Sequence, residues 1–142
     1  MITINPIYID YVLTPLVGGG DDAKEIAIYS VYQTDIEDDV KLLAKNILLP
    51  EFIKQHKQFK EAIKNSLAYY LIYNEKIDFK SVLISSLLPI KTPKNPMLFF
   101  QWIWDVFFEN ETIDYIKNKI VVEDFDINAP YNLLTKIGGY KN

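Results

Sequence analysis

The sequence predicts a mainly α protein, a compact bundle of about five to six helices around a central apolar helix at residues 96–109. Apolar residues recur three or four positions apart over much of the chain, and residues 96–109 are apolar on almost every side. In addition, residues 7–13 and 121–127 each show an alternating pattern. This pattern predicts a small two-stranded β element in which the two segments could pair.

Length and composition predict one domain. The chain has 142 residues, of which 49% are hydrophobic and 24% are charged. A chain of this size can bury a stable core without a disulfide or a metal ion. Residues 89–96 contain three prolines and are expected to form a rigid connector, because neither flanking part looks self-sufficient. We therefore expect a single globular domain, residues 1–142.

The chain begins with a predicted strand and a loop. The alternation that predicts the strand 7–13 is carried by Ile7, Ile9, Tyr11 and Leu13. Residues 14–22 contain Pro15 and three consecutive glycines, which interrupt regular structure. The carboxylates of Asp21 and Asp22 would repel a phosphate held by these glycines. We therefore expect a flexible or partner-contacting loop here.

Residues 23–33 could form either a helix or a strand. Asp22 is placed to cap a helix, with Glu25 three residues later. Residues 26–32, however, are rich in residues that favour strands. A helix is the slightly favoured interpretation.

Two helices are predicted in the middle of the chain. The pair Thr34 and Glu37 fits a capping box that begins the first of them, and Pro50 stops or restarts it. The second runs to about Tyr73 with an apolar side made of Phe52, His56, Phe59, Ile63, Leu67 and Tyr70. On that side His56 is expected to pack in the core or at its boundary, and a role as general base is disfavoured.

The helix that follows is short, and the next is the central one. Asp78 is placed to cap the short helix, which Pro89 ends and whose expected buried face is Phe79, Val82, Leu83 and Leu87. Asn95 and Pro96 provide a cap and a first position for the central helix. Its polar residues form one narrow stripe, Gln101, Asp105 and Glu109. This apolar run is too short to cross a membrane.

The last part of the chain is expected to contain shorter elements. Asn110 and Glu111 are placed to begin a helix that carries Ile113, Ile116 and Ile120. After the predicted strand 121–127, Pro130 and two glycines leave a short helix and coil.

The composition excludes several kinds of chemistry. The chain has no cysteine, one histidine and no arginine, since all 15 basic residues are lysines. A thiolate enzyme, a cysteine-ligated zinc or iron–sulfur site and an arginine finger are therefore impossible in this chain alone. The first residues lack the pattern of a signal peptide, so we expect a cytoplasmic protein.

No cofactor or metal ion is predicted. Residues 124–128 place Asp124, Asp126 and Asn128 at the spacing of a calcium loop, but Ala129 and Thr135 stand where such a loop needs glycine and glutamate. Direct nucleic-acid binding is not expected either, because the lysines of 41–64 are interrupted by acids and the chain has no arginine.

Charge is distributed unevenly along the chain. The formal net charge of −4 divides into −7 for residues 1–39, +6 for residues 40–94 and −3 for the remainder. Such segregation can speed encounter with an oppositely charged partner. The alternative is that acids cluster at helix N-termini while lysines solvate a helix face, without a role in recognition.

We therefore predict a non-enzymatic protein-binding function. The expected contact residues are the acids of 21–39 with two tyrosines: Asp21, Asp22, Glu25, Tyr29, Tyr32, Asp35, Glu37, Asp38 and Asp39. A small, acidic, cysteine-poor domain resembles in general type the bacterial immunity proteins that neutralise cognate toxins. The charge pattern, together with this likeness of type, predicts an inhibitor that covers the basic cleft of a toxin, such as a nuclease. We expect a monomer or weak homodimer that contacts neither nucleic acid nor membrane.

Two alternatives remain open. The first is a helical adaptor, or a phage or viral host-interaction protein, that binds a partner helix in a hydrophobic groove. The second, ranked last, is an enzyme with carboxylate or tyrosine chemistry.

Overall fold

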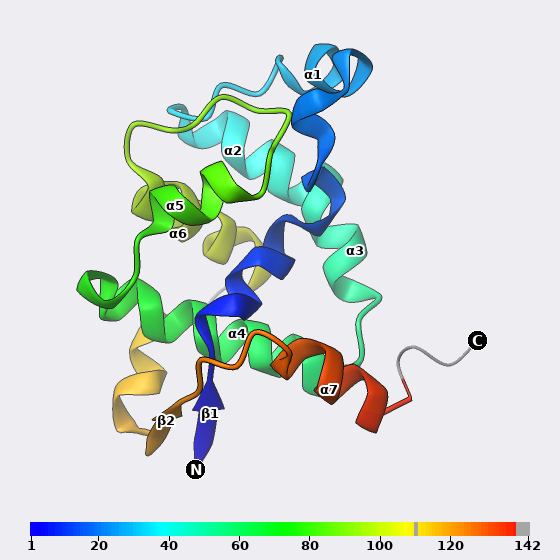
Figure 1. Cartoon of the computed structure of the whole chain (residues 1–142). Helices are drawn as coiled ribbons and strands as arrows, with labels where there is room; N and C mark the ends of the chain where they lie inside the picture. The colour runs from blue at the N-terminus through cyan, green and yellow to red at the C-terminus, as the bar shows by residue number, and fades with distance from the viewer. Residues whose placement is uncertain (110, 139–142) are drawn as a thin grey trace.

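The computed structural model describes residues 1–109 and 111–138 (Figure 1). The fold is mainly α, as predicted, with a small two-stranded sheet. In chain order the elements are β1 (Ile2–Ile4), η1 (Pro6–Leu16), η2 (Gly19–Asp21), α1 (Ala23–Tyr29), α2 (Glu37–Leu43), η3 (Ala44–Leu48), α3 (Leu49–Ile53), α4 (Lys57–Ile72), η4 (Asn74–Lys76), α5 (Phe79–Ser85), α6 (Pro96–Phe107), η5 (Ile113–Asn118), β2 (Val121–Glu123) and α7 (Ala129–Lys136).

Helix α6 is the central apolar helix that the sequence predicts. It begins as expected, because the Asn95 side chain accepts a hydrogen bond from the Leu98 amide at 3.1 Å and Pro96 occupies the first turn. Its buried side chains are Phe99, Phe100, Ile103, Trp104 and Phe107. The polar stripe is confirmed for Gln101 and Asp105, since the Gln101 amide donates to the Asp105 carboxylate at 3.1 Å, whereas Glu109 lies beyond the end of α6 at Phe107. Burial of such large apolar side chains stabilises the fold by roughly 1.5–3 kcal/mol each.

The long helix predicted up to Tyr73 is divided. Helix α3 ends at Ile53 and α4 begins at Lys57. Helix α4 then crosses the lower half of the molecule in Figure 1. The expected core position of His56 is wrong: His56 is exposed and caps α4, with its Nδ1 accepting a hydrogen bond from the Gln58 amide at 3.1 Å. The imidazole nitrogen thus satisfies an amide that has no partner within the helix.

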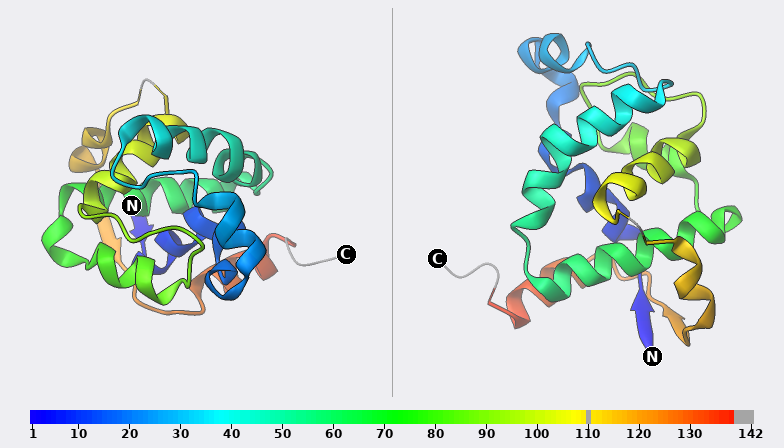
Figure 2. Two further views of the ribbon diagram at one scale, coloured as in Figure 1. Left: turned by 90° about the horizontal axis from the view of Figure 1, so that it is seen from above. Right: turned by 180° about the vertical axis from the view of Figure 1, so that it is seen from behind.

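The segment 37–53 is continuously helical, and it forms one side of the molecule when seen from behind in Figure 2. Between α2 and α3 the helix widens to a π-helical turn, η3, just before Pro50. Proline lacks an amide hydrogen and cannot donate to the carbonyl four residues earlier. The helix changes from π to α geometry at Leu49, next to Pro50, but it is not interrupted, so the sequence-based expectation that Pro50 stops or restarts it is met only by this change of helix type.

The two-stranded β element exists, but its first strand is not at 7–13. Strands β1 and β2 are parallel, with Ile2 opposite Val121 and Ile4 opposite Glu123. Residues 7–13 lie instead in the 3₁₀ helix η1, which starts where the Asn5 side chain accepts a hydrogen bond from the Ile7 amide at 3.0 Å. Its buried residues follow a helical spacing: Tyr8, Ile9, Val12, Leu13 and Leu16.

Two helix boundaries also differ from the prediction. No capping box forms at Thr34 and Glu37, because α2 begins only at Glu37. Asp78 caps α5 as expected, but Leu87 is exposed and has a positive φ of 51°, so it ends the helix and does not extend its buried face. The predicted helix start at Asn110 lies outside the described residues.

Candidate binding surface

The residues predicted to contact a partner lie in η2, in α1, in the segment after α1 and in the first turn of α2, and α1 itself lies at the top of the molecule in Figure 1. The prediction of a helix here is confirmed, and its cap is Asp22, whose Oδ1 accepts hydrogen bonds from the Lys24 amide at 2.9 Å and the Glu25 amide at 3.4 Å. None of the residues of α1 is buried. We call the surface formed by residues 21–39 the acidic end.

Three acids of the acidic end hold the chain in place. Asp35 accepts a hydrogen bond from the Lys94 amide at 2.7 Å, and Asp39 accepts one from the Gln33 amide at 2.9 Å. Glu37 forms an ion pair with Lys41 at 2.7 Å, one helical turn further along α2. These carboxylates therefore have structural partners, which fits the view that acids gather at helix N-termini.

Two other acids are free to meet a partner. Asp21 and Asp38 are exposed, and among the described residues their carboxylates neither accept a hydrogen bond nor form an ion pair. Glu25 is half-buried and lies against the glycine loop, because its Oε2 is 2.9 Å from the place that a Cβ on Gly19 would take. Sequence reasoning treated all these acids alike, whereas the structure singles out Asp21 and Asp38.

The tyrosines of the acidic end are only partly available. Tyr29 and Tyr32 are half-buried and pack against the core. The more exposed side chains are aliphatic: Ile28 and Val31 expose 61% and 68% of their surface. Sequence reasoning missed these residues, of which Ile28 lies in the seven-residue helix α1 and Val31 in the turn that follows it.

The glycine loop packs against the end of α5. Gly18 has a positive φ of 83°, which suits glycine. The Gly20 amide donates to the Leu87 carbonyl at 2.8 Å, and a Cβ at Gly20 would lie 3.0 Å from that backbone. The glycines therefore permit close approach of two backbones. This explains them without a contact to a partner, which the sequence-based expectation had favoured.

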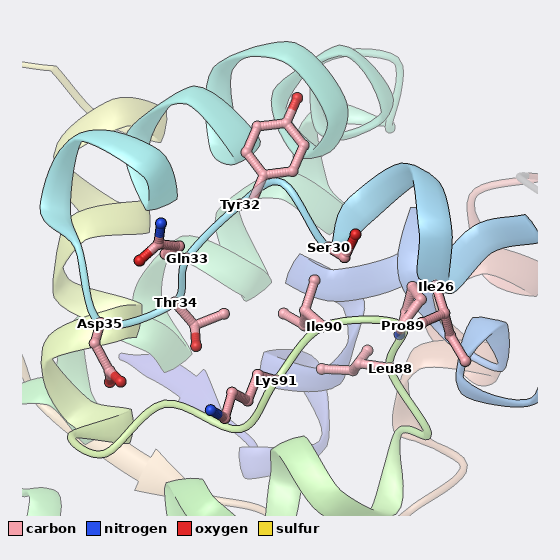
Figure 3. Close-up of a pocket in the computed structure, with 10 residues that line it drawn as sticks. All are labelled: Ile26, Ser30, Tyr32, Gln33, Thr34, Asp35, Leu88, Pro89, Ile90 and Lys91. Carbon is pink, nitrogen blue, oxygen red and sulfur yellow. The ribbon is translucent and has the colours of Figure 1, made fainter. Parts of the chain in front are cut away.

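A cleft of about 710 Å³ opens between the acidic end and the extended chain after α5 (Figure 3). Ile90 points into the space between the two segments, whereas the ring of Tyr32 is turned away from it. The polar groups along the cleft include the side chains of Ser30, Gln33 and Lys91. Apolar contacts and hydrogen bonds are both available there, a combination typical of binding sites.

Thr34 lies in this cleft with an unsatisfied hydroxyl group. The residue is only 3% exposed, and its Oγ1 has no hydrogen-bond partner among the described residues. Had the predicted capping box formed, this oxygen would have accepted from a backbone amide. An unpaired buried hydroxyl costs about 1–3 kcal/mol.

A second groove of about 670 Å³ lies between α2 and α6. Its apolar residues are Leu42, Leu49 and Val106, and its charged residues are Asp38, Lys41, Lys45, Asp105 and Glu109. Leu42 is 49% exposed. Lys41 lies between two carboxylates here, 2.7 Å from Glu37 and 3.9 Å from Asp105. The lysine-rich part of the chain thus reaches the edge of the acidic end and partly neutralises its negative charge there.

No protein-family model, no curated protein and no solved structure matches this chain. Function must therefore be argued from the chain itself. Across residues 1–109 and 111–138, no helix is long and apolar enough to cross a membrane. In the same part of the chain, no group of three or more His, Cys, Asp or Glu residues is placed to hold a metal ion.

The tyrosines with shifted pKa values lie away from the acidic end. Burial raises the pKa of Tyr8 to about 12, with a smaller contribution from the negative charge of Asp124. Burial also raises the pKa of Tyr70 and of Tyr115 above the ordinary value for tyrosine. These hydroxyls stay protonated near neutral pH, and that of Tyr115 donates to the Asn65 side chain. A tyrosine base would need the opposite shift.

Proposed function

We propose that this protein is a non-enzymatic inhibitor that binds a basic toxin, of the nuclease type, through the acidic end. The observation that carries this proposal is that one stretch of the chain, residues 21–39, carries both exposed aliphatic side chains and exposed carboxylates that form no hydrogen bond or ion pair among the described residues. Asp21 and Asp38 supply the carboxylates, and Ile28 and Val31 supply the aliphatic groups. In this role the carboxylates stand where the phosphates of the toxin's substrate would lie.

Charge supports the choice of a basic partner. Residues 21–39 contain seven acids and one lysine, and only part of this charge is neutralised by the ion pair of Lys41 with Glu37. A negative surface of this kind accelerates the encounter with a positive cleft and disfavours acidic partners. We therefore expect the association rate to fall steeply as the salt concentration rises.

The exposed aliphatic side chains support a protein partner. Full burial of a valine or isoleucine side chain contributes roughly 1.5–3 kcal/mol, and Ile28 of α1 and Val31 in the turn after it are exposed and available for such burial. Charge alone would give rapid but weak binding. The aliphatic groups of α1, next to the half-buried Tyr32, give the complex a desolvated centre.

The test is co-expression with the product of the adjacent reading frame, since inhibitors of this type are expected beside their toxins. The neighbouring product should arrest growth when expressed alone, and this chain should restore growth. The double variant Asp21→Asn and Asp38→Asn should restore it less well, and its complex should associate more slowly at low salt. A harmless neighbour, or a toxic one that this chain does not neutralise, contradicts the proposal.

A matched control removes the same charge elsewhere. Glu75 and Asp114 are exposed acids on η4 and η5, outside the acidic end. The double variant Glu75→Gln and Asp114→Asn should protect as well as the unmodified chain does. Equal loss in both double variants would mean that net charge matters and the acidic end does not.

A second candidate function, binding of a partner helix, is favoured by the groove between α2 and α6. About half of the surface of Leu42 is exposed in this groove, and a helix laid along the groove would cover it. Binding of this kind should persist at high salt and be lost on Leu42→Ser. Loss on Leu42→Ser together with full retention in Asp21→Asn and Asp38→Asn would favour this function over the first.

A further inference from the structure

A second feature of the surface lies on η1, apart from the acidic end. A depression of about 330 Å³ is lined by Ile7, Asp10, Tyr11, Thr14, Val17 and Ile127. It shares no residue with the cleft at Thr34. Five of its residues come from η1 and its C-terminal cap, and Ile127 comes from the segment between β2 and α7.

The depression contains one carboxylate, and that carboxylate is unpaired. Asp10 is half-buried, and among the described residues its side chain neither accepts a hydrogen bond nor forms an ion pair. Burial raises the pKa of this carboxyl above the ordinary value for aspartate. A partly desolvated carboxylate without a partner is unfavourable, so a cation placed beside it would be stabilised.

The walls of the depression are apolar and largely exposed. Val17 and Ile127 expose 52% and 76% of their surface, and Ile7 and the ring of Tyr11 complete the lining. A divalent metal ion would need several oxygen ligands and no apolar wall. An alkyl chain that ends in a positive charge fits better, because its stem can cover the apolar side chains while its charged end meets the carboxylate.

The size of the depression limits the ligand. A volume near 330 Å³ is at the lower end of the range for small-molecule pockets. It suits a single long side chain and is small for a nucleotide cofactor. Thr14, whose hydroxyl donates to the Tyr11 carbonyl at 2.8 Å, leaves its own oxygen as an acceptor near the rim.

We propose that this depression binds the end of a lysine or arginine side chain of a protein partner, with Asp10 pairing with the ammonium or guanidinium group and Val17 and Ile127 covering its alkyl stem. The site lies outside the acidic end and does not depend on the proposed inhibitor function. It adds a specific anchor for a basic residue at a place apart from the acidic end.

The test is a titration of the full chain, followed by amide chemical shifts, with capped amino acids as probes. The probes are N-acetyl-lysine methylamide, N-acetyl-arginine methylamide and the uncharged N-acetyl-norleucine methylamide. We expect the two cationic probes to shift the amide signals of Thr14, Val17 and Ile127 with dissociation constants on the order of 1–10 mM. The norleucine probe should bind about tenfold more weakly or not at all.

Two variants connect binding to this depression. Asp10→Asn should weaken binding of the lysine probe about tenfold, whereas Asp38→Asn, which removes an exposed charge elsewhere, should leave it unchanged. Thr14→Lys places a cation at the rim and should abolish binding of the probe, while Thr92→Lys, at an exposed threonine outside the depression, should not. These substitutions are at surface or half-buried positions, so folding can be checked from the remaining amide signals.

Three outcomes with these probes and variants would overturn the proposal, and a fourth, with n-butylammonium, would overturn the assignment to a protein side chain. The first is the absence of shifts at about 50 mM probe, a concentration well above the expected dissociation constant. The second is equal binding of the norleucine and lysine probes. The third is undiminished binding of the lysine probe by the Asp10→Asn variant. A fourth arm uses n-butylammonium, which carries the same cation without a peptide backbone. If it binds much more tightly than the capped lysine, the ligand is a free amine and the assignment to a protein side chain is wrong.

Discussion

Helices α6 and α1 begin in the same way and end up in opposite environments. Each has an Asx cap, Asn95 for α6 and Asp22 for α1, and each carries aliphatic or aromatic residues. Yet α6 buries five large side chains, whereas α1 buries none. Local signals decide whether a helix forms, while its neighbours decide how much of it the core buries. Apart from the partly buried Tyr29, which packs against the core, the side chains of α1 are largely available for binding.

The largest expected effect on stability comes from truncating one buried side chain of α6. Trp104 is 1% exposed, its ring centroid lies 4.3 Å from that of Phe108, and its indole N–H donates to the Glu111 carbonyl at 2.9 Å. Trp104→Ala should lower the free energy of unfolding by about 3–5 kcal/mol, because it leaves a cavity and an unpaired carbonyl. Chemical denaturation measures this loss.

The control for that variant lies two residues away on the same helix. Trp102 is only half-buried, so Trp102→Ala should cost clearly less than Trp104→Ala. If the two variants were equally destabilising, α6 would not have the sidedness that the structure gives it.

The two helix caps allow a matched test of the comparison. Asn95→Ala should lower the free energy of unfolding by about 1 kcal/mol, since α6 is part of the core. Asp22→Ala removes the corresponding hydrogen bonds from α1, which should open locally without the rest of the fold. We expect faster amide hydrogen exchange in α1 and a change in global stability of less than about 0.5 kcal/mol. Equal global losses would show that α1 is coupled to the core.

The unpaired carboxylate of Asp10 gives a test that depends on pH. Because burial raises its pKa in the folded state, Asp10 destabilises the fold at a pH above that raised value. Asp10→Asn should therefore increase the free energy of unfolding at pH 7, on the order of 1 kcal/mol. The increase should shrink as the pH falls through the raised pKa, and it should vanish below the ordinary pKa, where the carboxyl is protonated in both states.

Denaturation at about pH 7 and about pH 3 measures this difference. Asp114→Asn is the control, because the carboxylate of Asp114 is exposed and paired with Lys117 at 3.2 Å. It should change stability by less than about 0.5 kcal/mol at either pH. A stabilisation by Asp10→Asn that does not depend on pH would mean that the charge of Asp10 is not its cause.

The smallest effect on stability is expected at the exposed side of α1. Ile28→Ser should change the free energy of unfolding by less than about 0.5 kcal/mol, because 61% of the surface of Ile28 is exposed. The same variant should weaken the complex with the toxin by a larger amount, because Ile28 is expected to be buried there. If Ile28→Ser strongly destabilised the fold, Ile28 would be part of the core, as the buried residues of α6 are. That result would contradict the proposed contact surface.

Two Asn-Pro pairs show how far the sequence could predict the fold. At Asn95 and Pro96 the pair was correctly interpreted as a helix start, because a long apolar run follows. At Asn5 and Pro6 the same signal was missed, although the Asn5 side chain caps η1 in the same way. In 7–13 only Asp10 is polar, so the apolar pattern fits a period of two as well as a helical period.

The candidate surface was predictable only in part, because some of its features are local in sequence and others depend on distant segments. The cluster of acids in 21–39 and the cap at Asp22 follow from sequence. The division between acids with structural partners and free acids did not, because Asp35 is held by the amide of Lys94, which is 59 positions away. The depression at Asp10 was also missed, since Ile127 joins it from the far end of the chain.

Local sequence signals were enough to predict the mainly α class, the central helix and the helix starts at Asp22, Asp78 and Asn95, because caps, prolines and apolar spacing act within a few residues of each other. Which carboxylates remain unpaired, that no residue of α1 is fully buried and that the hydroxyl of Thr34 is buried without a partner among the described residues depend on the tertiary structure. These properties depend on contacts between distant segments, and no local pattern specifies which segments will meet.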